Sequence, residues 1–175
     1  LGSFNTALGY QALETLNYST ATDAYNVAVG MNAGQQMTTG VQNTLVGSLA
    51  GDALIDADYN VAVGKSALSG DTYGSRSVAI GQESLSTQNF TTATEAYNVG
   101  VGFYAGKSIT TGTHNTLIGG LAGDALSTGY ENVAVGLNAL TTDDVGARSV
   151  AVGTGALRDQ NMATSTSVYN VAIGH

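Results

Sequence analysis

Short stretches of alternating small and branched apolar residues recur along the whole chain. Each reads Asn or Ser, then Val or Thr, then usually Ala or Leu, then Val, Ile or Leu, and closes on glycine, as in Asn60–Gly64. Alternation with β-branched residues predicts a strand in which Val61 and Val63 point one way and Asn60 and Ala62 the other. Neither side of such a strand is richly polar, so we expect both sides to be covered.

The spacing of these phrases is regular. The closing glycines are Gly9, Gly30, Gly47, Gly64, Gly81, Gly102, Gly119, Gly136, Gly153 and Gly174. One interval of 21 residues is followed by three of 17 residues, so four coils make a superrepeat of 72 residues. When residues 26–81 are aligned with residues 98–153, more than half of the positions are identical. The short, 17-residue unit is too short for a helix pair and suits one turn of a parallel β-solenoid with two strands and two bends. We predict an all-β solenoid of about ten coils, with residues 1–175 forming a single repeat domain.

Small residues at fixed places predict close packing between coils. Three positions after each closing glycine stands Ala in eight of nine cases, and the next position carries Leu or Gly in the order of the superrepeat. We expect corners with positive φ at the closing glycines and a core whose layers alternate in size. The opening amides are expected to form a structural ladder along a rod of roughly 45 Å. Its predicted members are Asn26, Asn43, Asn60, Asn98, Asn115 and Asn132, with Ser77 and Ser149 as substitutes.

Composition excludes several classes of function. Only 10% of the residues are charged, and 13 acidic against 5 basic residues give a net charge of -8. This excess argues against nucleic acid and anionic membranes as partners, because too few cations are present to neutralise phosphates. The chain has no Cys, which excludes disulfides, zinc–thiolate sites and thiol nucleophiles. No apolar run approaches the roughly 18 residues of a membrane span, so no membrane insertion is predicted.

The apolar residues point to association between chains. With 3 Phe and no Trp, a single thin roll has a small core. Association with further copies would bury the second apolar side of the strands. The chain starts in the approach to one phrase and stops directly after another at His175, without visible caps, so we expect a longer fibre at both ends.

Two forms of the phrase are similar to repeats of known fibres. Asn26–Gly30 and Ser77–Gly81, each followed by a small residue three positions on, resemble the head repeats of YadA-type trimeric autotransporter adhesins. The longer form in Thr39–Gly47 and Thr111–Gly119 resembles repeats of bacteriophage tail fibres and related trimeric bacterial surface fibres. The resemblance covers essentially the whole chain. It implies a left-handed β-roll, a homotrimer about the fibre axis, and attachment outside the cell, on a virion or a bacterial surface.

The long, 21-residue coils contain the candidate recognition loops. Their segments 17–25, 89–97 and 161–169 each offer an aromatic or large apolar residue beside hydroxyls, which suits contact with a sugar or a protein. The alternative is that Tyr18, Phe90 and Met162 pack back onto the roll or clamp a neighbouring subunit. The candidates are Tyr18, Thr20, Thr22, Asp23, Phe90, Thr92, Thr94, Glu95, Met162, Thr164 and Thr166.

The acidic residues do not predict a metal site. They lie mainly in bends, and the Asp-rich nonapeptide of calcium β-rolls is missing. Asp143 and Asp144, like Asp56 and Asp58, are expected to be solvated turn residues. We therefore predict neither a metal nor a cofactor.

The arginines are expected to form ion pairs between coils or between subunits, and no catalytic group is predicted. Arg76 and Arg148 stand in equivalent Gly-x-Arg-Ser segments, each five positions after an acid, Asp71 or Asp143. Two His residues are too few for a metal site or a triad, and no enzyme is predicted.

The sequence thus predicts a stiff attachment segment of a trimeric phage or bacterial surface fibre. Its partners would be further copies of itself and a cell-surface glycan or protein receptor, with avidity from loops repeated along the fibre. One alternative is a monomeric extracellular solenoid, for example an ice-binding one, although Thr does not recur in every coil. A tailspike glycan depolymerase is disfavoured, because no carboxylate pair recurs in a setting suited to glycoside hydrolysis.

Overall fold

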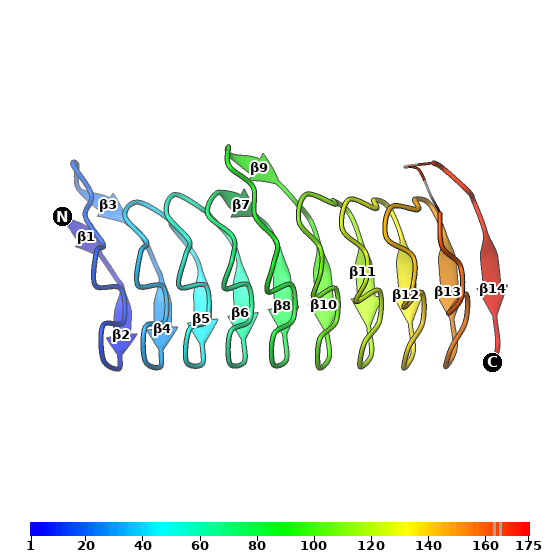
Figure 1. The fold of residues 1–175 in the computed structure, drawn as a ribbon. Coiled ribbons are helices and arrows are strands. Elements are labelled where there is room, and N and C mark those ends of the chain that lie inside the picture. The colour runs from blue at the N-terminus through cyan, green and yellow to red at the C-terminus, as the bar shows by residue number, and fades with distance from the viewer. Residues whose placement is uncertain (163, 165) are drawn as a thin grey trace.

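The parallel β-solenoid predicted from the repeats is present. The computed structural model describes residues 1–162, 164 and 166–175. Its main sheet holds ten parallel strands stacked along a rod, and no helix occurs among the described residues (Figure 1). The strands are β2 (Thr6–Leu8), β4 (Val27–Val29), β5 (Thr44–Val46), β6 (Val61–Val63), β8 (Val78–Ile80), β10 (Val99–Val101), β11 (Thr116–Ile118), β12 (Val133–Val135), β13 (Val150–Val152) and β14 (Val171–Ile173).

Neighbouring strands pair in register with an offset of one coil. Val27 lies opposite Thr44, one short coil further on, whereas Val78 lies opposite Val99, one long coil further on. Each described coil therefore rests on the next through parallel main-chain hydrogen bonds, the arrangement of a one-dimensional repeat protein.

A coil contains one regular strand of the main sheet, not the two that we predicted. Among the described residues, further short strands occur only where a long coil meets the coil before it: β1 (Gly2–Ser3) pairs with β3 (Thr22–Asp23), and β7 (Gly74–Ser75) pairs with β9 (Thr94–Glu95). Elsewhere the chain still bonds from coil to coil, as from Gly51 N–H to the Ala67 carbonyl at 2.9 Å. Left-handed residues between these bonds prevent the second side from forming a regular strand.

The middle residue of each strand faces the interior and its two neighbours face outward. Ala62 is fully buried, whereas Val61 and Val63 on either side of it are half-buried. The coil itself therefore covers one side of the strand, and the outward side forms two columns along the rod in which Val and Ile predominate. These columns are Thr6, Val27, Thr44, Val61, Val78, Val99, Thr116, Val133, Val150 and Val171, and Leu8, Val29, Val46, Val63, Ile80, Val101, Ile118, Val135, Val152 and Ile173.

The core alternates large and small residues, as predicted. A Cβ placed on Gly34 would lie 2.8 Å from Leu45 Cδ1, and one placed on Gly51 would lie 2.9 Å from Leu45 Cδ2. In β6 and β8 the strand carries Ala instead, and the turn position that follows carries a fully buried leucine, Leu68 or Leu85. The size alternation fills the narrow interior without room for a second large side chain.

The closing glycines are corners with positive φ, as predicted. Their φ values lie between 126° and 143°, and a Cβ on Gly47 would approach the Gly64 carbonyl oxygen to 2.5 Å. The sequence did not reveal that other residues share the left-handed region, for example Tyr59 at 61°, Ser66 at 53° and Leu68 at 54°. Each such residue costs about 1 kcal/mol or more, which the stacking of coils must offset.

The asparagine ladder lies inside the roll and is fully buried. Asn60 N–H donates to Asn43 Oδ1 at 2.9 Å, and Asn60 Nδ2 donates to the Gly74 carbonyl at 2.9 Å. The same pattern returns at Asn115, whose Oδ1 accepts from Asn132 N–H at 3.1 Å. Each side chain thus satisfies main-chain groups of the next coil that the strands do not pair.

Removing one rung should destabilise the roll. Asn115→Ala leaves the Gly129 carbonyl and the Asn132 N–H without their buried partners, so we expect the free energy of unfolding to fall by about 2 kcal/mol or more. The measurement is urea denaturation, with the exposed Asn161→Ala as control. A loss no greater than that of the control would contradict the structural role of the ladder.

Candidate functional site

The large residues of the predicted recognition loops face the roll. Tyr18 is 5% and Phe90 6% exposed, while Met162 is half-buried. Tyr18 Oη donates to the Gly40 carbonyl at 2.5 Å and accepts from Asn26 Nδ2 at 3.1 Å, so it takes part in the ladder. The two rings therefore pack on the roll, which was the alternative that the sequence left open, and neither is available to a ligand from solution.

The hydroxyl and acidic candidates stay on the surface. Figure 1 shows the long loops standing above the shorter ones beside β3 and β9. Residues 163 and 165 of the third loop, Ala163 and Ser165, lie outside the described residues. The exposed candidates are Thr20, Asp23, Thr92, Glu95, Thr164 and Thr166, and the half-buried ones are Thr22 and Thr94.

Both arginines form ion pairs with residues of a neighbouring coil, as predicted. Arg76 Nε lies 2.9 Å from Glu95 Oε1, and Arg148 Nε lies 2.7 Å from Glu131 Oε2. The acids five positions before the arginines, Asp71 and Asp143, are fully buried. The bend turns these two carboxylates into the roll, whereas the arginines remain at its surface.

Asp71 organises the interior of a long coil. Its Oδ1 accepts from Gly74 N–H and Phe90 N–H, both at 3.0 Å, and its Oδ2 accepts from Gln88 Nε2 at 2.5 Å. Gln88 Oε1 in turn accepts from Asn98 Nδ2 at 2.9 Å. This chain of buried hydrogen bonds takes the place of the asparagine rung where serine interrupts the ladder.

Asp143 accepts the equivalent hydrogen bonds in the next superrepeat, so it is a buried structural residue and not the solvated turn residue that we predicted. Its Oδ1 accepts from Gly146 N–H at 3.0 Å and Met162 N–H at 3.2 Å. Asp56 and Asp144 are exposed, and Asp58 is half-buried. A signal for this role was present in the column seven positions after each closing glycine, where acids interrupt apolar residues. That column reads Leu16, Met37, Leu54, Asp71, Gln88, Ile109, Leu126, Asp143 and Gln160.

Loss of the Asp71 charge should weaken the fold. In Asp71→Asn the new NH₂ group would face Gln88 Nε2, so that two donors meet. If the Gln88 amide rotated to present its oxygen to the new NH₂ group, its own NH₂ group would face the donor Asn98 Nδ2. We expect the free energy of unfolding to fall by about 2 kcal/mol in thermal denaturation. The control is Asp159→Asn, because the Asp159 side chain is 82% exposed. Equal melting temperatures for the two variants would refute the assigned role.

Two further carboxylates sit in the turns at equivalent places. Asp52 and Asp124 each bury an Oδ1 that has no hydrogen-bond partner among the described residues. Desolvation raises the pKa of both carboxyls above the ordinary value. Among the described residues, no group of three or more His, Asp or Glu side chains could hold a metal ion.

The raised pKa values predict a pH-dependent stability. A carboxyl whose folded pKa lies above its unfolded value of about 3.9 stabilises the fold at low pH and loses this contribution as the pH rises through the folded pKa. The variant Asp52→Asn/Asp124→Asn keeps both sites neutral, so its melting temperature should exceed that of the parent at pH 7 and converge with it towards pH 3. Thermal scans across this range are the measurement, with Asp159→Asn as control. A variant less stable than the parent at pH 7 would contradict the prediction.

A column of aromatic and charged side chains runs beside the ladder. Each residue directly before a ladder position has positive φ, between 50° and 63°. Phe4 and Tyr25 stack with centroids 5.1 Å apart, and Arg76 Cζ lies 4.7 Å from the Tyr59 ring centre. The sequence did not single out this column, whose members are Phe4, Tyr25, Gln42, Tyr59, Arg76, Tyr97, His114, Glu131, Arg148 and Tyr169.

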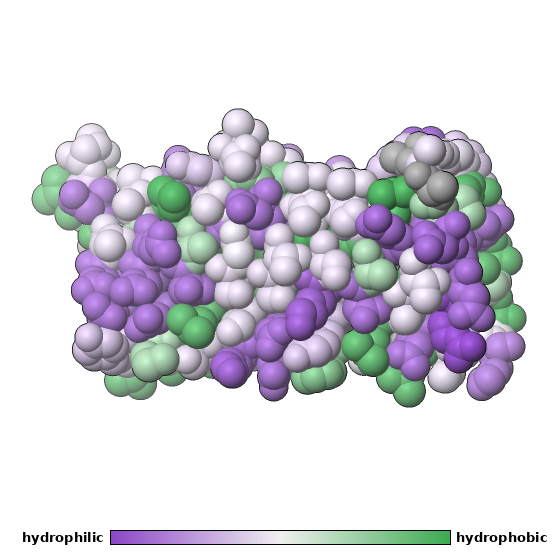
Figure 2. All heavy atoms as spheres, viewed as in Figure 1, coloured by the Kyte–Doolittle hydropathy of each residue, from purple (hydrophilic) through white to green (hydrophobic). Residues whose placement is uncertain are grey.

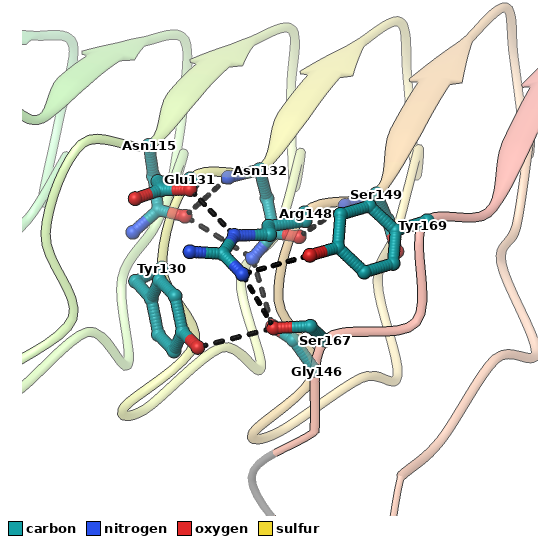
Figure 3. A network of polar contacts seen from close by, with 9 residues as sticks. All are labelled: Asn115, Tyr130, Glu131, Asn132, Gly146, Arg148, Ser149, Ser167 and Tyr169. Carbon is teal, nitrogen blue, oxygen red and sulfur yellow. Dashed lines mark hydrogen bonds and ion pairs between the residues drawn. The ribbon is translucent and has the colours of Figure 1, made fainter.

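The column contains one arginine whose polar groups are largely engaged by neighbours. Figure 3 shows Arg148 between the rings of Tyr130 and Tyr169, which lie 5.5 and 5.6 Å from its Cζ. Its Nη1 donates to Ser167 Oγ at 3.1 Å and to Tyr169 Oη at 2.9 Å, in addition to the pair with Glu131. This side chain links successive coils across the surface.

A groove opens beside the other arginine. Its volume is about 210 Å³, and it lies at the amino ends of β6 and β8, next to the second long loop. Hydrogen bonds from Tyr97 Oη and Arg76 hold the pKa of Glu95 below its ordinary value, so this carboxylate stays charged. The lining residues are Asp58, Tyr59, Ser75, Arg76, Ala93, Thr94 and Glu95, of which the sequence had indicated Thr94 and Glu95. The groove offers hydrogen-bond donors and acceptors beside an aromatic ring.

Comparison with family models, with curated proteins and with solved structures gives no match for this chain. Within the part of the chain that the structure describes, no helix is long and apolar enough to span a membrane.

Proposed function

We propose that this chain is a stiff segment of a homotrimeric attachment fibre, on a phage tail or a bacterial surface. The observation that supports this most is the uncovered apolar side of the main sheet. Its two columns run through all ten strands, and Ile80 and Ile118 are exposed even in the middle of the rod. A continuous apolar face of this length is unusual on a monomer and is typical of a face covered by another chain.

The apolar face continues past the ends of the strands. Residues directly after the closing glycines include the exposed Tyr10, Met31, Phe103 and Leu137. Figure 2 shows hydrophobic residues along the lower edge of the rod, the edge at which the strands end in Figure 1. Side-by-side packing of parallel rods would bury this face over its whole length. The number of three chains and the left-handed winding rest on the resemblance to YadA-type heads and tail-fibre repeats.

A mechanical role agrees with the bonding of the rod. Every described coil is joined to the next by main-chain bonds and by buried side chains, which makes a stiff spacer. The long loops recur every four coils, so a trimer would present each of them three times around the axis, and weak contacts to a glycan or protein receptor would gain by avidity. In this proposal the fibre lies outside the cell, and the chain has no catalytic role.

The mass in solution tests the trimer. Light scattering at several concentrations should give three times the chain mass of 17.6 kDa, with a heat-stable assembly. A monomer of 17.6 kDa at all concentrations would contradict the proposal and favour a self-contained solenoid.

A paired variant links that mass to the apolar face. Val63→Asp/Val135→Asp places charges on the outward side of β6 and β12, and burying them between chains would cost far more than leaving them in water. We expect the mass to fall to that of the monomer. The control is Thr92→Asp on the exposed second long loop. If the Val variant stays assembled, the chains do not meet at this face.

A further inference from the structure

We propose that the groove beside Arg76 binds one ring of a neutral saccharide. The inference rests on the attachment function proposed above and names a ligand class and a site for it. The groove is separate from the outward Val columns, because its residues precede the strands β6 and β8 instead of lying on them.

Arg76 keeps binding capacity towards the groove. Among the hydrogen bonds of the described residues, its guanidinium donates only through Nε, to Glu95 Oε1 at 2.9 Å. The guanidinium lies over Tyr59, 4.7 Å from the ring centre, and 5.9 Å from that of Tyr97. Stacking between two rings fixes its plane while the terminal nitrogens remain able to donate.

The other polar groups are also held in place with capacity left over. Asp58 Oδ1 accepts from Val41 N–H at 2.8 Å, which leaves Oδ2 as an acceptor. Ser75 Oγ accepts from Asp58 N–H at 3.0 Å, which leaves its hydroxyl hydrogen to donate. Glu95 is 58% exposed along its side chain, so its oxygens can accept further bonds. Groups fixed before binding lose little entropy when a ligand arrives.

The chemistry of the lining favours a neutral sugar. Two carboxylates against one guanidinium leave the groove with a net negative charge, in a chain of net charge -8, which disfavours phosphate or uronate. Sugar hydroxyls both donate and accept, and the C–H groups of a sugar ring can contact the Ala93 methyl group and the edge of the Tyr59 ring, one face of which Arg76 covers. The volume of about 210 Å³ is below the roughly 300 Å³ of sites for drug-sized ligands, which suits a single ring.

The second superrepeat shows that the coil does not need these residues for its fold. At the places equivalent to Asp58, Tyr59 and Glu95, one superrepeat further on, stand Tyr130, Glu131 and Ser167. Arg148 there binds Ser167 and Tyr169 through Nη1, as Figure 3 shows. The buried network is the same in both superrepeats, with Asp143 and Gln160 for Asp71 and Gln88. Packing therefore accounts for the shared interior but not for the groove.

The sequence difference between the two superrepeats supplies a matched variant for the test. Asp58→Tyr/Tyr59→Glu/Glu95→Ser places the residues of the second superrepeat in the first, where the same coil can accommodate them.

Binding is measured by saturation-transfer difference NMR. The neutral probes are tetrasaccharides of glucose, galactose and mannose, and the anionic comparators are sialyllactose and a glucuronate tetrasaccharide. We expect saturable binding of at least one neutral probe, weakened at least tenfold by the triple variant, whose melting temperature stays that of the parent. Phe4→Ala, which removes a 66% exposed ring far from the groove, should bind as the parent does.

Three results would overturn the proposal. These are the absence of a signal from all neutral probes, binding of the anionic probes alone, and undiminished binding by the triple variant. If the triple variant is less stable than the parent, Asp58→Asn and Tyr59→Leu measured separately should each weaken binding, and unchanged affinity in both would refute the site. A trimer that binds no saccharide would refute this site and leave the fibre proposal intact. A monomer that binds a saccharide would refute the trimeric fibre and leave this site intact.

Discussion

Close approach of one coil to the next constrains every other feature of the fold. The main chains stand one strand spacing apart, about 4.8 Å, and at the corners the backbone comes so near that a Cβ on Gly47 would lie 2.5 Å from the next carbonyl oxygen. This spacing makes every coil the template for its neighbour. It also holds several non-glycine residues in the left-handed region, since an isolated coil would not offset their cost.

Because each coil is so thin, polar residues supply much of the cohesion that a large apolar core provides elsewhere. Asn43 and Asn60 bond main-chain groups that no strand can reach, and Asp71 with Gln88 closes the gap where the ladder changes to serine. Buried networks of this kind are costly when incomplete and specific when complete. They fix the register of each coil on the next, which keeps the surface columns aligned along the rod.

The same geometry divides the outside of the rod into surfaces with different chemistry. The outward strand positions carry Val and Ile, which suits contact with further chains, whereas the residues before the ladder carry rings and charges. Tyr59 and Arg76 belong to this second surface, where they meet Glu95 from the long loop. One repeat thus combines a face for assembly with a polar groove, and the proposed attachment function uses both.

The architecture could be predicted from the amino-acid sequence, since the phrase ending at Gly64 and its equivalents recur at intervals that parallel stacking brings into register. The ladder and the corners could be located in the same way, because spacing alone aligns Asn43 with Asn60. The directions of side chains in the bends became visible only in the folded chain. Asp71 turns inward and Arg76 meets Glu95 from the next coil, because left-handed residues redirect the chain at places that carry no glycine. The groove likewise joins residues of successive coils, a proximity that local sequence does not encode.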